Sequence, residues 1–411
     1  MKSCPNQTSS IASTQRRTLW ILSTAQIFSG FGAGAVVSTG SLLAVEMTGS
    51  PAWAGSITTA STLGGAFASA ALSRLAFSKG RRFSLSTGLA IAALGSVLVI
   101  VSALLSFFPL LLLSGCMIGF GAAVNLQARF AATDLALPQH RGRDLSLIMW
   151  MSTVGAIAGP NMTGPGKLVG AWLGIPALSG IFVFSAIGMV AAMAVLTVGL
   201  RPDPYLLSCK LGSTQDNSPR SRFFEGVKAL WEYKKARVAL ATIISSQAIM
   251  VAIMSMTPVH MDTHGASIEV VGLTVSLHIA GMYALSPVMG LLSDKLGPQP
   301  MMLLGIFAIL VSAVTAAFSY SSVPTSIVAL ILLGLGWSAS TVAASTLLND
   351  AVPGPIRVAT QGASDALMGV AGGFGGALAG VMLATIGYLG LGIVGAVIAG
   401  ITIVIVFSQS R

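Results

Sequence analysis

The stretch Gly290–Pro300, reading GLLSDKLGPQP, is a short charged loop between two long hydrophobic segments. A related stretch, ALSRLAFSKGRR at 71–82, lies about 217 residues earlier and also separates two hydrophobic segments. In the later copy Gly290 would let two helices approach closely, Asp294 would accept hydrogen bonds at a helix end, and Gly297 would permit a tight turn. Two such loops in corresponding halves indicate a duplicated chain.

The composition of the chain predicts that lipid covers most of its surface. Hydrophobic residues make up 54% and charged residues 8% of the 411 residues, and the mean hydropathy is +0.85. Soluble globular proteins carry roughly 25% charged residues. The three cysteines, Cys4, Cys116 and Cys209, are scattered without metal-ligand spacing. They therefore predict neither a disulfide framework nor a metal site.

Hydrophobic segment lengths predict twelve membrane-spanning helices, because one crossing needs about 20 mostly apolar residues. The predicted ranges are 19–46, 52–76, 83–107, 109–133, 146–168, 172–200, 238–261, 268–291, 300–320, 324–348, 363–387 and 389–408. The fold class is therefore an all-α polytopic membrane protein with two six-helix repeats. Its predicted parts are a cytoplasmic N-terminal tail (1–18), an N-terminal bundle (19–200), a cytoplasmic linker (201–237), a C-terminal bundle (238–408) and a cytoplasmic C-terminus (409–411). Within the linker, FFEGVKALWEYKKAR has helical spacing compatible with a helix on the membrane surface.

The positions of Lys and Arg predict the orientation of these spans. If the N-terminus is inside, 21 of the 22 basic residues fall on the inner side and only Lys167 falls outside. Inner loops carry such an excess in membrane proteins. The net charge of +10 is therefore a topology signal in a cell-membrane protein with both termini cytoplasmic. Nucleic acid is excluded as a partner; the lipid bilayer is expected as one.

Further matches support the duplication. Asp134 followed by Arg141 corresponds to Asp350 followed by Arg357, at an offset of 216 residues. We interpret these residues as inner-gate or helix-end ion pairs, Asp134 with Arg129 or Arg141 and Asp350 with Arg357. Parallel six-helix repeats usually hold a substrate site between the halves near the bilayer midplane.

With twelve spans, a central linker and these loops, the chain resembles the major facilitator superfamily over nearly its whole length. The family's loop motif is matched by Gly290, Asp294, Lys295 and Gly297, and in the first copy by Gly80, Arg81 and Arg82. In the first copy Phe77 or Ser78 stands where the family has an aspartate. The resemblance implies that these loops form a cytoplasmic charge lock that favours the outward-facing state.

A second motif lies in the fifth predicted span, with Gly155, Gly159, Pro160 and Gly164. It resembles the glycine–proline signature of the family's drug/proton antiporters. The alternative is ordinary close helix packing with a proline kink. In the fourth span the run at 119–123, GFGAA, is also typical of the family, but Gly115 occupies the place of the family's arginine. This departure disfavours proton-coupled export.

Two titratable residues inside predicted spans are proton-coupling candidates, because charged groups within a membrane are costly and mark function. His278 lies near the middle of the eighth span and titrates near neutral pH. Its alternative role is a neutral imidazole bonded to a neighbouring helix. Asp365 lies at the start of the eleventh span. His260, Asp262 and His264 are interpreted as part of a solvated outer loop rather than a metal site.

Polar and aromatic residues at mid-depth are candidates for the lining of a substrate cavity. They are Gln26, Asn125, Trp150, Gln247 and Trp337. No cluster of fixed positive charge accompanies them, which disfavours a multiply charged anion as substrate. No phosphate-binding GxxxxGK[ST] loop, HExxH sequence or nucleophile elbow is present. We therefore expect no enzyme, no cofactor and no direct drive by ATP.

These patterns predict a secondary transporter working by alternating access, a monomer with a small-molecule substrate and protons as partners. The first hypothesis is proton-coupled export of small apolar or cationic organic compounds. The alternative is an uptake permease for a neutral small metabolite. A non-transporting membrane sensor is a third hypothesis, but it leaves the mid-membrane polar residues unexplained.

Overall fold

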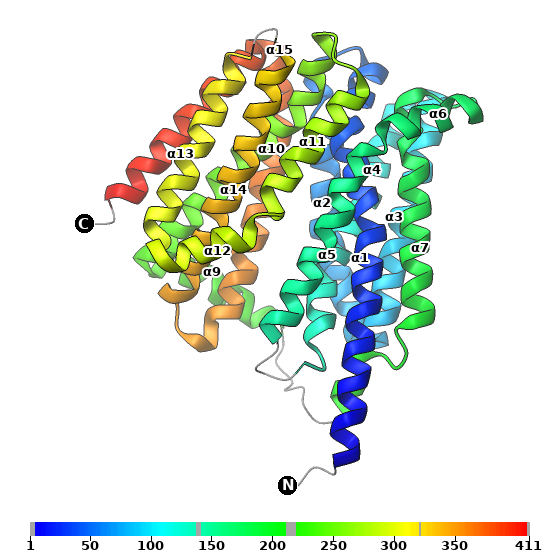
Figure 1. Ribbon diagram of the computed structural model, residues 1–411, viewed down its shortest axis with the longest axis vertical. Coiled ribbons are helices and arrows are strands. Elements are labelled where there is room, and N and C mark those ends of the chain that lie inside the picture. Colours follow the sequence, from blue (N-terminus) through cyan, green and yellow to red (C-terminus); the bar gives the residue numbers. More distant parts are fainter. Residues whose placement is uncertain (1–4, 137–140, 211–218, 320–321, 409–411) are drawn as a thin grey trace. The chain divides into compact units, whose positions relative to one another are not determined.

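The computed structural model describes residues 5–136, 141–210, 219–319 and 322–408, and every regular element in those ranges is a helix (Figure 1). The elements are α1 Pro5–Thr48, η1 Pro51–Trp53, α2 Ser56–Lys79, α3 Arg81–Leu105, α4 Phe108–Thr133, α5 Arg141–Asn161, α6 Thr163–Leu173, η3 Ala177–Ser179, α7 Ile181–Gly199, α8 Pro204–Lys210, α9 Pro219–Glu232, α10 Lys234–Thr263, α11 Ile268–Tyr283, α12 Ser286–Leu296, α13 Pro298–Ala317, α14 Val323–Ala351 and α15 Gly354–Ser408. The all-α fold class is confirmed.

Nine stretches of the described residues are helical, long and apolar enough to cross a membrane. Twelve were predicted, and three differences account for the gap. The last two predicted ranges both lie in α15, which is counted as one stretch although its helix is broken at Gly387. The helices α2 and α5, which are rich in serine, threonine and glycine, are not among the nine.

Glycine and proline explain where helices differ from the predicted ranges. The range 268–291 is split after Tyr283, where α12 begins with Pro287 in its first turn. Proline lacks a backbone N–H and cannot continue the preceding helix's hydrogen bonds. The range 172–200 is interrupted because α6 ends at Leu173 and Gly174 turns the chain with φ 68°. In α15 the helix is interrupted at Gly387, whose angles of φ 68° and ψ −178° are not helical, at the predicted boundary between the last two spans.

The chain divides into two compact units, which are described separately. Unit 1 comprises 1–36 and 63–216. In it α3 packs between α4 and α7 (Figure 1). Its core is built from apolar side chains that are fully buried. Among them are Leu85 and Leu89 of α3, Ile148 of α5 and Met189 of α7.

Unit 2 comprises 37–62 and 217–411. Here α10 packs along α15, and α13 packs against both α14 and α15 (Figure 1). Its core contains the buried side chains of Leu230, Ile243, Met302 and Leu347. The division at 216 falls inside the predicted linker, but residues 37–62 were predicted to belong to the N-terminal bundle.

Close backbone packing explains why 37–62 belongs to unit 2. A methyl group at Gly55 would overlap the carbonyl oxygen of Gly376 in α15. One at Gly380 would lie 2.5 Å from the carbonyl oxygen of Ala52. The Thr59 hydroxyl donates a hydrogen bond of 3.1 Å to the carbonyl of Gly373. Glycines thus bring η1 and the start of α2 directly onto α15, as small residues do in membrane helix packing.

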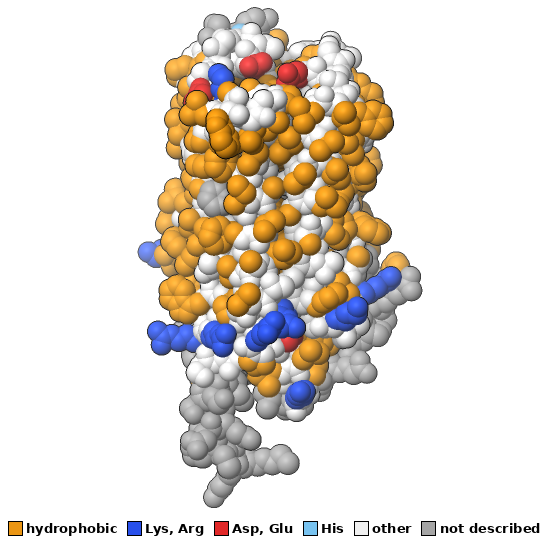
Figure 2. All heavy atoms as spheres, turned by 90° about the vertical axis from the view of Figure 1, so that its right-hand side faces the viewer, with side chains coloured by type: hydrophobic (Ala, Val, Ile, Leu, Met, Phe, Trp, Pro, Cys, Tyr) orange, Lys and Arg blue, Asp and Glu red, His pale blue; other side chains and the backbone are white. Residues whose placement is uncertain are grey.

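The surface matches a lipid environment. Figure 2 shows a face whose middle is covered by hydrophobic side chains, with Lys and Arg gathered in a band near one end. Large exposed apolar side chains include Leu105, Ile187, Val190 and Val198. Exposed apolar area on this scale is rare in soluble monomers.

The close packing of glycines in α15 against residues 52–55 can be tested with two substitutions in the same helix. Gly380→Ala should destabilise unit 2 by about 1–3 kcal/mol, because the methyl group meets backbone that cannot move aside. Gly369→Ala, also in α15, meets open space and should be neutral or stabilise by up to about 1 kcal/mol through helix propensity. Thermal unfolding of the two purified variants measures the difference. Equal unfolding temperatures would contradict the close packing of Gly380 against Ala52.

Candidate functional site

The two charged loops adopt the same turn. Gly80 precedes α3 with φ 89° and ψ 168°, and Gly297 precedes α13 with φ 89° and ψ 154°. Residues other than glycine rarely adopt these backbone angles. The correspondence of the two loops therefore extends from sequence to backbone geometry.

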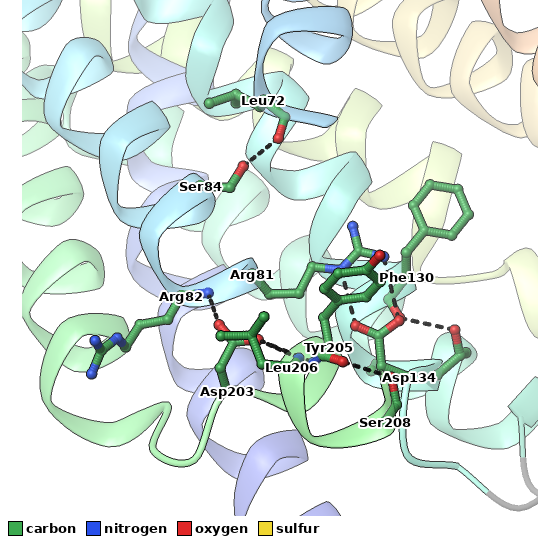
Figure 3. Close-up of polar contacts among 12 residues, drawn as sticks. Leu72, Arg81, Arg82, Ser84, Phe130, Asp134, Asp203, Tyr205, Leu206 and Ser208 are labelled. Atoms are coloured by element: carbon green, nitrogen blue, oxygen red, sulfur yellow. Dashed lines mark hydrogen bonds and ion pairs between the residues drawn. The ribbon is translucent and has the colours of Figure 1, made fainter. Parts of the chain in front are cut away.

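The loop of unit 1 contains a paired guanidinium and carboxylate. Arg81 Nε lies 2.9 Å from Asp134 Oδ2, and Arg81 Nη2 lies 3.3 Å from Oδ1 (Figure 3). The two side chains are only 14% and 13% exposed. The Tyr205 ring covers the Arg81 guanidinium at 5.6 Å. A two-point contact of this kind fixes the start of α3 against the end of α4.

Burial dominates the titration of Asp134. Desolvation raises the pKa of its carboxyl above the ordinary value, although the hydrogen bond and charge of Arg81 pull the pKa down. The salt bridge to Arg81 lowers the pKa of Asp134, whereas the net change is a rise. Burial is thus the largest cause of the raised pKa, and the nearby charge of Asp203 also raises it.

Asp203 is a further carboxylate at this loop. Its Oδ2 accepts a hydrogen bond of 2.7 Å from the backbone N–H of Arg82. Its Oδ1 accepts from the backbone N–H groups of Tyr205 and Leu206, at 3.0 and 3.2 Å (Figure 3). One side chain therefore caps the beginnings of α3 and α8 together. A methyl group on Gly80 would lie 2.5 Å from its Oδ2, so glycine is needed there for space as well as for its backbone angles.

We call Arg81, Arg82, Asp134 and Asp203 the unit 1 lock. The sequence had suggested Arg129 or Arg141 as partners of Asp134, whereas the observed ion pair is with Arg81. Arg129 Nε donates to the carbonyl of Leu126, and the side chain of Arg141 lies outside the described residues. Asp203 was missed, although an aspartate before a helix with proline at its first position is a cap signal.

The loop of unit 2 is different, although its motif is better preserved. Asp294, Lys295 and Asp350 are exposed, and the one ion pair in the described part of the chain is that of Arg81 with Asp134. Apart from the backbone of its own helix and its chain neighbours, no described atom lies within 4 Å of a methyl group placed on Gly290. Within unit 2, no described neighbour makes the close helix approach that was expected at Gly290. The side chain of Arg357 also lies outside the described residues.

Two predicted cavity residues meet in unit 1. Gln26 of α1 donates from Nε2 to the backbone carbonyl of Asn125 in α4, at 3.2 Å. The Ser29 hydroxyl donates to Asn125 Oδ1 at 2.6 Å. Gln26 is buried and Asn125 half-buried. Trp150, from α5, is 49% exposed. The α1–α4 contact is thus a neutral hydrogen-bonding group.

Two other predicted cavity residues meet in unit 2. Trp337 of α14 donates from Nε1 to Gln247 Oε1 of α10, at 2.8 Å. The ring of Tyr283, at the end of α11, stands edge-on to Trp337 with centroids 5.7 Å apart and planes at 72°. A methyl group at Gly372 of α15 would lie 3.1 Å from Gln247 Nε2. We call Gln247, Tyr283 and Trp337 the aromatic–amide cluster; Tyr283 was not predicted from the sequence.

The proton-coupling candidates lie in contrasting surroundings. His278 is fully buried in α11, and its Nδ1 lies 2.7 Å from the carbonyl oxygen of Leu330 in α14. Because a carbonyl only accepts, Nδ1 carries the proton and Nε2 is left as a bare acceptor. That Nε2 has no hydrogen-bond partner among the described residues. Asp365 of α15 is exposed.

The fifth-span motif packs α5 onto α1. A methyl group at Gly155 would overlap the backbone carbonyl of Ile27. Gly34 of α1 faces Gly159 and Pro160, with the Pro160 ring 2.5 Å from a methyl group placed on Gly34. The helix ends at Asn161, one residue after the proline, and Gly164 follows in α6. This geometry favours the helix-packing interpretation of the motif.

A buried acid in unit 1 was also missed. Asp144, in the first turn of α5, is 2% exposed, and Gln15 of α1 is 9% exposed. Gln15 Nε2 donates to Asp144 Oδ2 at 2.8 Å and to the carbonyl of Ala132 at 2.7 Å. Gln15 thereby joins α1, α4 and α5. It falls within 1–18, predicted as a tail, but the structure continues α1 through the described part of that range.

Near the C-terminal end of α10, three aromatic rings lie in contact: one pair is stacked and the other is tilted. His260 lies parallel to Tyr388 of α15, with centroids 4.1 Å apart and planes at 8°. The His264 ring is 4.3 Å from that of His260. Tyr388 also exchanges a hydrogen bond of 2.8 Å with Thr257. The histidines interpreted as loop residues are thus joined to the bend of α15 next to Gly387.

Comparison with known proteins agrees with this architecture. A family model described as Major Facilitator Superfamily matches residues 22–268 and 238–410. The chain is 37% identical over 402 residues to the uncharacterized MFS-type transporter YdeG of Bacillus subtilis (strain 168), covering 97% of this chain and 93% of the relative. It is 26% identical over 363 residues to the riboflavin transporter RfnT of Brucella anthropi, covering 87% and 86%. A solved structure of a bacterial homolog of the human lysosomal transporter Spinster, inward-facing and unoccupied, has a TM-score of 0.75 at 17% identity, covering 100% and 98%.

The unit 1 lock generates a pH-dependent prediction. Arg81→Ala should destabilise the protein by about 3–5 kcal/mol at neutral pH, because it leaves a buried carboxylate without a counter-charge. Asp134→Asn should cost much less, and the double variant should recover most of the Arg81→Ala loss. Chemical or thermal unfolding of the four proteins measures this cycle.

The sign of the pH effect follows from the raised pKa of Asp134. A folded-state pKa above the unfolded value means that the stability from this group is complete below the unfolded pKa and is lost as pH rises through the folded pKa. Removing Arg81 raises that pKa further. The penalty of Arg81→Ala should therefore shrink as pH falls from neutral to acidic. A penalty independent of pH would show that Asp134 is not its cause.

Proposed function

The chain belongs to the Major Facilitator Superfamily and is a membrane transporter, and we propose that it exports small, largely apolar or cationic organic compounds in exchange for protons by alternating access. The observation that carries the substrate class is the aromatic–amide cluster. Tryptophan and tyrosine rings attract apolar rings and cations, while Gln247 and Trp337 add hydrogen-bonding groups without a net charge. A polyanion would find no fixed cation in this cluster.

The polar contact of unit 1 extends the proposal. Gln26 in α1 and Gln247 in α10 belong to the first span of each repeat, and each bonds to a residue of the fourth span, Asn125 or Trp337. Corresponding spans of the two repeats thus each carry a polar contact, and transporters built from parallel repeats hold their substrate near the bilayer midplane. We assign Gln26, Asn125 and Trp150 as additional substrate contacts.

Asp365 is the preferred proton carrier. It is an exposed carboxylic acid inside a predicted span, and acids within spans are typical of proton relays. His278 is the second candidate. Its buried Nε2 is available to a proton only if α11 and α14 move apart around the hydrogen bond to Leu330. Such movement is the essence of an alternating-access cycle, so both residues are tested below.

The charged loops serve as the inner gate in this proposal. The excess of Lys and Arg at these loops supports a cytoplasmic location, with both termini inside a cell membrane. The unit 1 lock supplies the fixed contacts. At the loop of unit 2, Asp294, Lys295 and Asp350 are exposed and can form different contacts as the protein changes state. Gly297 and Arg357 are assigned to the same gate from the sequence pattern.

Uptake of a neutral metabolite is the second candidate function. It is favoured by the likeness to RfnT, whose name gives riboflavin as its cargo. An uncharged ring compound with several hydrogen-bonding groups suits the aromatic–amide cluster as well as an apolar cation does. The absence of the family's fourth-span arginine, with Gly115 in its place, also weighs against proton-coupled export.

Transport by the reconstituted protein distinguishes these functions. Liposomes containing an internal pH dye are mixed with lipophilic aromatic cations and, separately, with riboflavin. Proton movement opposite to a cation supports export, and riboflavin entry without such exchange supports uptake. In the exporting case Asp365→Asn should abolish proton movement. If coupling survives in both Asp365→Asn and His278→Ala, the assignment of the proton carriers is wrong.

The substrate contact is tested at Trp337. Trp337→Phe keeps a ring but removes the Nε1–H bonded to Gln247, and should raise the KM for transport about tenfold, the equivalent of about 1.4 kcal/mol. Trp172→Phe, at a side chain that is 85% exposed, is the control and should transport normally. An unchanged KM in Trp337→Phe would remove the aromatic–amide cluster from the substrate site.

A further inference from the structure

The helix α9, which precedes α10 in unit 2, has three different sides. Gly226, Ala229 and Leu230 are buried, and the last two belong to the unit 2 core. Because residues three, four and seven positions apart share a side of a helix, these residues fix the side that faces the protein. In agreement, α9 packs along α15 and against the start of α10.

A second side of α9 is apolar and exposed. Phe224, Val227 and Trp231 follow the three-and-seven spacing, with Phe224 71% and Trp231 63% exposed. Val227 is half-buried at the edge of the core. Aromatic side chains of this kind are enriched where membrane meets water. Exposing two large rings to water is unfavourable, because removing apolar surface from water lowers the free energy.

The third side is charged. Glu225, Lys228 and Glu232 repeat the same spacing one residue further along, and all three are exposed. One stripe thus meets protein, one is aromatic, and one is suited to water. A helix lying in the plane of the membrane boundary, flanked by protein, needs these three sides. A helix surrounded by water or by lipid alone would not.

Exposed cations follow directly. Lys234, Lys235 and Arg237 lie in the first turn of α10 and are exposed. Cations at the start of a helix are disfavoured by its dipole, and none of the three has an ion-pair partner among the described residues. An anionic surface next to the α9–α10 junction would supply the missing counter-charge, at about 1 kcal/mol for each basic residue near the membrane.

We propose that α9 is an interfacial anchor: Phe224 and Trp231 insert at the headgroup–acyl boundary of the bilayer, and Lys234, Lys235 and Arg237 bind anionic phospholipid headgroups beside it. The occupant of this face is the lipid surface. The anchor ties the linker between the repeats to the bilayer at the point where α10 enters it.

Fluorescence of the full-length protein in liposomes tests the insertion. Subtracting the emission of Trp231→Phe from that of the wild type isolates Trp231 among the six tryptophans. Phosphatidylcholine brominated near the headgroup end of its acyl chains should remove most of this emission, and lipid brominated near the terminal methyl should remove little. Quenching by aqueous iodide instead would overturn the proposal. Bromolipid quenching that disappears at high protein-to-lipid ratio would place a second copy of the chain on this face and would also overturn it.

Neighbouring positions provide the matched control. Spin labels on Phe224→Cys and Glu225→Cys, adjacent in sequence but on different sides of α9, should respond to membrane-dissolved oxygen and to a water-soluble paramagnet respectively. Adding phosphatidylglycerol to the liposomes should strengthen the shallow quenching of Trp231, and Lys234→Gln/Lys235→Gln/Arg237→Gln should remove that increment alone. Equal responses at 224 and 225, or an increment that survives the triple substitution, would contradict the anchor.

Discussion

The need to satisfy every backbone N–H and C=O inside hydrocarbon is the constraint on which this structure depends. A chain with 8% charged residues cannot rely on water for these groups, and helices satisfy them locally. Several helix breaks among the described residues have a specific chemical cause, as at Gly174, Pro287 and Gly387. Glycine also allows close helix packing, because a residue without a side chain lets two backbones touch. Gly55 packs on Gly376 in this way, and Gly155 packs on Ile27.

Periodic and local features of the fold were predictable from sequence. The similar turns at Gly80 and Gly297 both need backbone angles that glycine adopts readily, and the glycine is visible in the sequence of each loop. Mid-span polar residues were recognised because polar groups stand out against an apolar background, and the structure brings Gln26 to Asn125 and Gln247 to Trp337. Partners distant in sequence were harder to predict. Asp203 accepts a hydrogen bond from Arg82, 121 positions away. No sequence pattern around either residue indicates that the two are partners.

The two loops show why motif preservation is a poor guide to contacts. The loop of unit 2 keeps its aspartate, yet Asp294 is exposed. The loop of unit 1 has lost that aspartate and still holds the ion pair, because Arg81 reaches Asp134 at the end of α4. A carboxylate from outside the loop, Asp203, occupies the backbone donors at the beginning of α3. What the duplication preserved on both sides is the shape of the turn, while the charges that use it have diverged.

Asp203 stands at the exit from the sixth predicted span, where the chain leaves unit 1 for the linker. Its carboxylate divides its two oxygens between helices that run in separate parts of the sequence, α3 and α8. Displacing α8 would therefore uncap α3 in the same movement. The start of the linker is therefore coupled to the unit 1 lock through a single side chain, and a shift of α8 would act directly on the hydrogen bond at the backbone N–H of Arg82.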